Sequence, residues 1–124
     1  MNIKVLVADT SSKVRENFTR SLKEIGVQNV MEAGDAKSAI NLLKQEQFNA
    51  VLADGKIQTE SGKDLVEEIR HIDSNVPIIL TANPADCSTE FELKDSSTYR
   101  YLTKPFTTQR LRDKLQQLVP AIAG

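Results

Sequence analysis

Short apolar segments recur along the chain, and several of them end in a single polar residue. The segments richest in Val, Ile and Leu cover residues 3–8, 50–53, 76–80 and 101–102. Apolar runs of this kind, without regular polar alternation, are typical of strands buried on both faces, as in parallel sheets that helices cover. We therefore predict a parallel sheet as the centre of the fold.

The connections between these segments carry one-sided apolar stripes with helical spacing. Four stripes contain Val14, Phe18, Leu22 and Ile25; Ala36, Ala39, Ile40 and Leu43; Leu65, Val66, Ile69 and Ile72; Leu111, Leu115, Leu118 and Val119. A further helix is expected between Pro84 and Ser97, where Phe91 and Leu93 are the main apolar anchors. The predicted order is a strand followed by a helix, five times.

Capping residues and glycines mark where these elements begin and end. Asp35 and Ser61 precede apolar stripes, as helix N-caps do, and Asp86 is a candidate cap or first-turn acid for the helix expected after Pro84. Gly26 and Gly34 mark the ends of elements.

Strands that alternate with helices through right-handed crossovers predict a doubly wound α/β fold. The 124 residues fit one domain, residues 1–124. We expect a single (βα)5 domain of the flavodoxin-like kind, with a five-stranded parallel sheet in the order 2-1-3-4-5. In this order the first and third strands are neighbours, and the ligand crevice opens at the carboxyl ends of the strands.

Four of the predicted strands end in side chains that can do chemistry: Asp9, Asp54, Thr81 and Lys104. Adjacent strands lie about 4.8 Å apart, so Asp9 and Asp54 would face each other within reach of one bound ion. Two like charges about 4 Å apart repel by roughly 4 kcal/mol at an effective dielectric near 20, so the pair requires a cation, a proton or an amine. A lone carboxylate there is more often a helix cap, but four converging polar ends favour a site.

Charge and composition narrow the function classes. The formal net charge is −1, which gives no basic field for a nucleic acid, so we expect no nucleic-acid partner. The sequence shows neither an apolar secretory segment nor an apolar run long enough to span a bilayer, so no membrane partner and a cytoplasmic location are expected. Cys87 is the single cysteine, which agrees with a reducing compartment.

Four motifs, in order along essentially the whole chain, resemble the receiver domains of bacterial two-component response regulators, the CheY-like group. They are Val5-Leu6-Val7-Ala8-Asp9 with Arg15 beyond, Ala53-Asp54 followed by Ser61-Gly62, Pro77-Ile78-Ile79-Leu80-Thr81-Ala82, and Tyr101-Leu102-Thr103-Lys104-Pro105-Phe106. Each motif alone is weak, and the four together at these spacings are strong.

The resemblance implies that Asp54 accepts a phosphoryl group from a phosphohistidine, on a sensor histidine kinase or a phosphotransfer protein. Mg²⁺ would be bound by the acids after the first strand, by Asp54 and at Lys56, where the family supplies a backbone carbonyl. Lys104 would supply an ammonium group to the phosphoryl oxygens. Any enzymatic activity would be limited to self-phosphorylation from phosphohistidine and auto-dephosphorylation.

The resemblance also implies a switch and a docking face. Thr81 would donate its hydroxyl to a phosphoryl oxygen, and the aromatic residue at the Tyr101 position would then turn inward. With no output domain attached, we expect the signal to leave through a downstream protein. This partner would dock on the face formed by the helix expected at 84–97, the strand ending at Thr103 and the last helix, with Phe91, Tyr101 and Leu111 as candidate contacts.

Three positions depart from the pattern of this family or modify it. Thr10 stands where a second acid is usual, so we expect weaker Mg²⁺ binding; its hydroxyl could bind the metal, and we favour a role as cap of the first helix. Gln58 replaces a usual proline, which predicts a looser loop. Lys56, together with Lys104, could balance Asp9 and Asp54 without a metal.

Two functions therefore remain in view. One is a phosphoryl-accepting switch, and the other is a degenerate receiver-like binding module that signals without phosphorylation or metal. A flavodoxin-like cofactor binder shares the sheet, but residues 10–13 lack the glycine that a close approach to a phosphate group usually requires. Phosphorylation at Asp54 distinguishes the first two.

Overall fold

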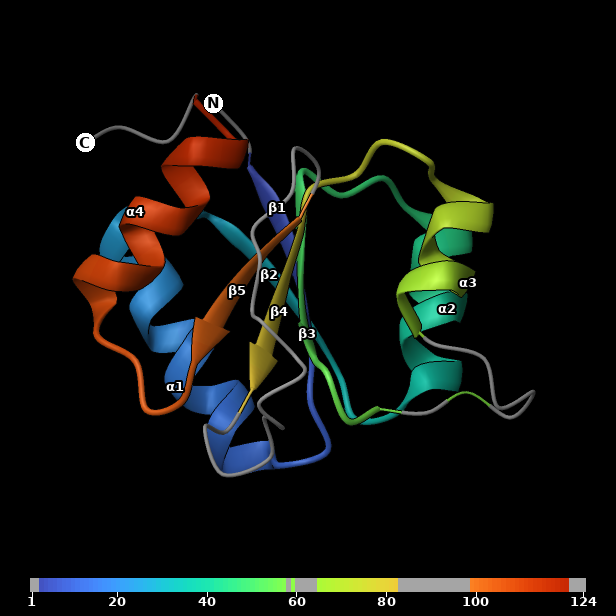
Figure 1. Ribbon diagram of the computed structural model, residues 1–124, viewed down its shortest axis with the longest axis horizontal. Helices are drawn as coiled ribbons and strands as arrows, with labels where there is room; N and C mark the ends of the chain where they lie inside the picture. Colours follow the sequence, from blue (N-terminus) through green and yellow to red (C-terminus); the bar gives the residue numbers. More distant parts are fainter. Residues whose placement is uncertain (1–2, 58, 60–64, 83–98, 121–124) are drawn as a thin grey trace, which may run out of the picture.

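The computed structural model describes residues 3–57, 59, 65–82 and 99–120 (Figure 1). Its five strands form one sheet in the order β2-β1-β3-β4-β5, and all neighbouring pairs are parallel. The strands are β1 (Lys4–Ala8), β2 (Asn29–Ala33), β3 (Ala50–Asp54), β4 (Ile78–Ala82) and β5 (Tyr99–Thr103). The predicted doubly wound α/β fold and its strand order are confirmed.

Helices cover both faces of this sheet. They are α1 (Ser12–Ile25), α2 (Ala36–Gln45), α3 (Leu65–Ile72) and α4 (Thr108–Leu118). In Figure 1, α1 and α4 lie on one face and α2 and α3 on the other. Here α4 is the last predicted helix, whereas the helix expected at 84–97 lies outside the described residues. Within the described part of the chain, no helix combines the length and apolarity that crossing a membrane requires.

The predicted apolar stripes form two cores, one on each face. Phe18 and Leu22 of α1 pack with Leu111 and Leu115 of α4 against one side of the sheet. On the other side, the core contains Ala39 and Leu43 of α2 with Leu65 and Ile69 of α3. All five residues of β3 are buried, as expected for a central parallel strand. The expectation that Leu111 contacts a partner is wrong, because its side chain is fully buried in the core.

Local hydrogen bonds fix the helix ends. Asp35 is the N-cap of α2, as predicted, and accepts a hydrogen bond from the Ser38 N–H at 2.7 Å. Gly26 ends α1 with a left-handed φ of 108°, a conformation that favours glycine. The predicted caps Ser61 and Asp86 lie outside the described residues.

The prediction that Thr10 caps the first helix is wrong. The N-cap of α1 is Ser11, whose hydroxyl accepts a hydrogen bond from the Val14 N–H at 3.3 Å. The Asp9 carboxylate accepts a hydrogen bond from the Ser11 N–H at 2.9 Å, which forms a tight turn at the end of β1. Because this turn includes Thr10, the helix begins one residue later than expected and Thr10 is left exposed.

Candidate functional site

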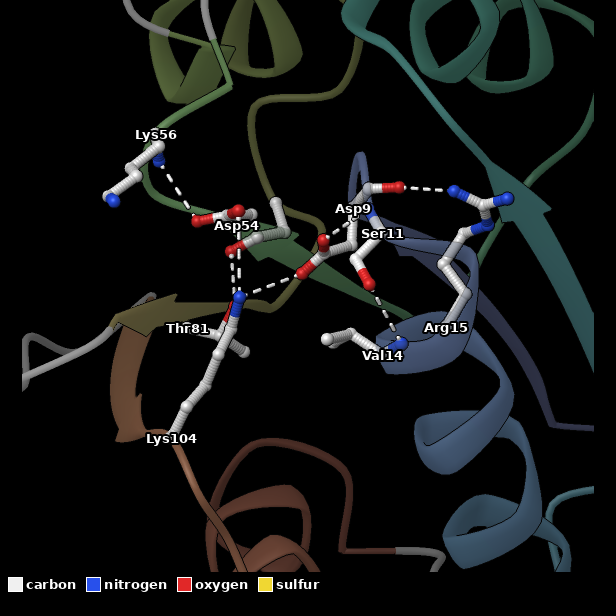
Figure 2. Close-up of polar contacts among 9 residues, drawn as sticks. Asp9, Ser11, Val14, Arg15, Asp54, Lys56, Thr81 and Lys104 are labelled. Atoms are coloured by element: carbon white, nitrogen blue, oxygen red, sulfur yellow. Dashed lines mark hydrogen bonds and ion pairs between the residues drawn. The ribbon is translucent and has the colours of Figure 1, made fainter.

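The sheet brings Asp9, Asp54, Thr81 and Lys104 together at its carboxyl edge (Figure 2). Strand β1 pairs directly with β3, and Asp54 is the register partner of Thr81 on β4. Lys104 follows β5, and its backbone N–H donates to the Ala82 carbonyl at 2.8 Å. The convergence that the strand ends predicted is therefore present.

The Lys104 ammonium group bridges the two carboxylates. Its Nζ lies 2.9 Å from Asp9 Oδ2 and 3.5 Å from Asp54 Oδ2. The carboxylate side chains are 3% and 11% exposed, so little water screens them. Two acids held this close repel each other, and the ammonium group between them offsets that repulsion.

Backbone N–H groups bind the remaining carboxylate oxygens. Ser11 N–H donates to Asp9 Oδ1 at 2.9 Å, and Lys56 N–H donates to Asp54 Oδ1 at 3.1 Å. Each of the four carboxylate oxygens thus has a hydrogen-bond donor or an ammonium group within 3.5 Å. This arrangement fixes the orientation of both carboxylates.

The loop that carries Lys104 is fixed against α1. The Phe106 ring stacks on the Phe18 ring, with centroids 4.2 Å apart and the planes 10° from parallel. Thr108 Oγ1 lies 3.0 Å from Ser21 Oγ, which joins the start of α4 to α1. The bridging ammonium group therefore extends from a loop that is held by the sheet on one side and by a helix on the other.

Thr81 lies beside Asp54 on the next strand and is 1% exposed. Its hydroxyl donates to the Ala53 carbonyl at 3.5 Å, a long hydrogen bond, and its own carbonyl accepts from Gly55 N–H at 2.9 Å. Tyr101, the other predicted switch residue, is half-buried on β5 and pairs in register with Leu80. The hydroxyl is thus weakly held in the interior next to the candidate acceptor.

The predicted metal ligands differ in how the structure places them. Asp9 and Asp54 meet, whereas Thr10 is exposed and Lys56 binds Asp54 through its backbone N–H. Figure 2 shows the bond from the Lys56 backbone N–H to the Asp54 carboxylate. Among the described residues, no group of three or more His, Cys, Asp or Glu side chains gathers as a metal site. The acidic part of this site is the Asp9 and Asp54 pair.

The sequence predicted no role for two residues that touch Asp9, although Arg15 belongs to the first receiver motif. Ser11 holds its carboxylate through the backbone N–H, and Arg15 Nη1 donates to its backbone carbonyl. Ser11 could have been found, because an Asp two residues before a Ser favours a turn that places the Ser at a helix start. Nothing in the pattern around Arg15 indicated which group its guanidinium would bind.

Comparison with known sequences places the chain in a family. The model of the family described as "Response regulator receiver domain" matches residues 5–116. The chain therefore belongs to the response regulator receiver domain family, and it is CheY-like.

Relatives and solved structures agree with this assignment. Chemotaxis protein CheY-3 of Vibrio cholerae is 29% identical over 119 residues, which is 94% of this chain and 92% of that protein. The receiver domain of Francisella response regulator 1452 has a TM-score of 0.76 and 28% identity, covering 94% and 96% of the two chains. The receiver domain of sensor histidine kinase PA1611 from Pseudomonas aeruginosa has a TM-score of 0.80 and 22% identity, covering 98% and 100%. That structure carries a magnesium ion in its active-site cleft.

Proposed function

We propose that this receiver accepts a phosphoryl group on Asp54 from the phosphohistidine of a sensor histidine kinase or a phosphotransfer protein. One observation carries the proposal. The Asp54 carboxylate lies at the end of a central strand, with Oδ1 held by a backbone N–H and Oδ2 facing an ammonium group. Membership of the receiver family supports the same role.

The chemistry assigns a part to each neighbour of Asp54. A carboxylate oxygen attacks the phosphorus in line, the P–N bond breaks, and its electron pair returns to the ring nitrogen of the donor histidine. Charge on the phosphoryl oxygens must then be met by cations and donors. Lys104, 3.5 Å from Asp54 Oδ2, supplies the ammonium group. Thr81 supplies a hydroxyl once it releases the Ala53 carbonyl.

The donor set at this edge fits Mg²⁺, which prefers oxygen ligands. Asp9 and Asp54 would hold the ion, with the Thr10 hydroxyl and the Lys56 carbonyl as further oxygens. When bound, Mg²⁺ neutralises charge on the phosphoryl group. We propose that binding is weaker than in a receiver with two acids after β1, because Thr10 brings no charge and Lys104 already binds both carboxylates.

We propose that the signal passes from Thr81 and Tyr101 to a downstream protein at the surface of β5 and α4, together with the expected helix at 84–97. Thr81 pairs with Leu102 on β5, so a movement of Thr81 reaches that strand directly. Tyr101 is the adjacent residue and is half-buried.

The alternative is a receiver-like module that signals without phosphorylation. The ion pairs favour it, because Lys104 compensates the two acids in the absence of any added cation. In that case Asp54 would serve the stability of the site and no reaction would occur there.

Intact-mass measurement separates these two functions. The protein is incubated with magnesium chloride and acetyl phosphate, and separately with a phosphohistidine-containing phosphotransfer protein. We expect wild type to gain the mass of one phosphoryl group and Asp54→Asn to gain none. Glu46→Gln is the matched control, because it removes a carboxylate paired with a lysine at the other end of the same sheet. If folded wild type gains no mass from either donor, the phosphoryl-acceptor proposal is overturned.

A further inference from the structure

Arg15 joins three elements behind the carboxylate site. Its Nη1 donates to the Asp9 backbone carbonyl, and its Nε donates to Glu32 Oε1 on β2 at 3.2 Å (Figure 2 shows the first bond). The Arg15 side chain is 19% exposed and that of Glu32 is 42% exposed. One guanidinium group from α1 therefore holds the end of β1 and the end of β2 together.

Gly34 lies directly beside this guanidinium. A Cβ atom at Gly34 would lie 3.3 Å from Arg15 Nη1, which is closer than most such contacts. Glycine at position 34 therefore lets the guanidinium lie flat against the chain. On the other side, Thr19 Oγ1 donates to Glu32 Oε2 at 3.4 Å and helps to orient the acid that Arg15 binds.

Asp9 is held through every polar atom that it has. Its N–H donates to the Ala33 carbonyl at 3.1 Å, Oδ1 accepts from Ser11 N–H, and Oδ2 accepts from Lys104 Nζ. The backbone carbonyl, bound by Arg15, belongs to the planar peptide unit that leads to Thr10. Holding this oxygen fixes the orientation of the Asp9–Thr10 peptide.

We propose that Arg15 is a positioning residue of the receiver site, which sets the Asp9–Thr10 peptide and thereby the place of the Asp9 carboxylate. The importance of Arg15 for phosphoryl transfer rests on the proposed function. Its effect on the position of Asp9 does not, because that effect is a property of the unphosphorylated protein. Lysine cannot replace Arg15 here, because a single ammonium group does not reproduce the two-sided geometry of a planar guanidinium.

Three variants test this role by nuclear magnetic resonance. Arg15→Lys keeps the positive charge but replaces the planar guanidinium, with its several N–H donors, by a single ammonium group. Gly34→Ala adds a methyl group next to Arg15 Nη1 and alters no group of the site. Arg20→Lys makes the same change as the first variant at an arginine of the same helix whose side chain is 68% exposed. The readouts are the amide signals of Thr10 and Ser11 and the dissociation constant of Mg²⁺, from a magnesium chloride titration.

We expect Arg15→Lys to shift both amide signals and to weaken Mg²⁺ binding by roughly tenfold. Substitution of a residue that hydrogen-bonds a metal ligand commonly has an effect of this size. Gly34→Ala should act in the same direction with a smaller effect, and Arg20→Lys should match wild type. The double variant Arg15→Lys/Gly34→Ala should be no worse than Arg15→Lys in Mg²⁺ binding, because both changes act on one contact. If Arg15 only stabilised the fold, Arg15→Lys would lower the midpoint of urea unfolding, and its dissociation constant for Mg²⁺ would equal that of wild type.

The inference is overturned if Arg15→Lys leaves the Thr10 and Ser11 signals and the Mg²⁺ constant as they are in Arg20→Lys. A wild-type protein that binds no Mg²⁺ and gains no phosphoryl group would contradict the proposed function. Even then, the amide shifts in the metal-free protein would decide whether Arg15 positions Asp9.

Discussion

Two lysine–carboxylate pairs lie at opposite ends of the same sheet. At the start of β1, Lys4 Nζ lies 2.6 Å from Glu46 Oε1, and beyond its end Lys104 Nζ lies 2.9 Å from Asp9 Oδ2. The shorter pair is the more exposed one, with side chains 30% and 33% exposed, against 23% and 3% for Lys104 and Asp9. Distance alone therefore does not distinguish a site from a surface contact.

Burial and the number of acids do distinguish them. Lys4 binds one acid in contact with water, where an ion pair contributes little to stability. Lys104 binds two acids, and removing it would leave both carboxylates facing each other with little access to water. The site beyond the end of β1 therefore places two buried carboxylates around one ammonium group, whereas the start of β1 has a single partly exposed pair.

The largest expected effect comes from removing each ammonium group in turn. Lys104→Met should lower the free energy of unfolding by about 1–3 kcal/mol, because it leaves two buried carboxylates without a cation. Lys4→Met should lower the free energy of unfolding by about 0–1 kcal/mol, because the side chain of its partner Glu46 is 33% exposed and water can solvate it. Urea unfolding at neutral pH and low salt measures both values. Equal losses in the two variants would contradict the distinction between these pairs.

A smaller effect is expected from restoring an acid after β1. Thr10→Asp should tighten Mg²⁺ binding by roughly tenfold, equivalent to about 1.4 kcal/mol, because it adds a charged oxygen ligand beside Asp9. Ser12→Asp is the control, since it places the same charge at an exposed position of the first turn of α1. Calorimetric titration with magnesium chloride gives both constants. If Ser12→Asp improves binding as much as Thr10→Asp does, general charge and not coordination is responsible.

The position of the site followed from the sequence because strand ends are marked by a change from apolar to polar residues. Asp9, Asp54, Thr81 and Lys104 each follow or end such a run, and parallel strands bring these ends to one edge. The cap of α1 did not follow, because Thr10, Ser11 and Ser12 offer three hydroxyls in succession. Asp9 two residues before Ser11 was the one signal that selects among them, and in the structure the Ser11 N–H binds the Asp9 carboxylate while the Ser11 hydroxyl accepts from the Val14 N–H. The hold of Arg15 on Asp9 depends on a side-chain conformation that no periodic pattern records.

The smallest effect concerns an exposed acid at the same edge of the sheet. Asp35 follows β2 and caps α2, and the bond from Ser38 N–H to its carboxylate lowers its pKa from the usual value. A pKa lowered by folding gives stability that is present above the unfolded-state pKa and is lost as the pH falls through the folded-state pKa. Asp35→Asn keeps a cap oxygen and removes the titration. Urea unfolding should show the variant slightly less stable than wild type at pH 7, with the difference disappearing at strongly acidic pH. A difference that persists unchanged at acidic pH would mean that the Asp35 charge contributes nothing to the cap.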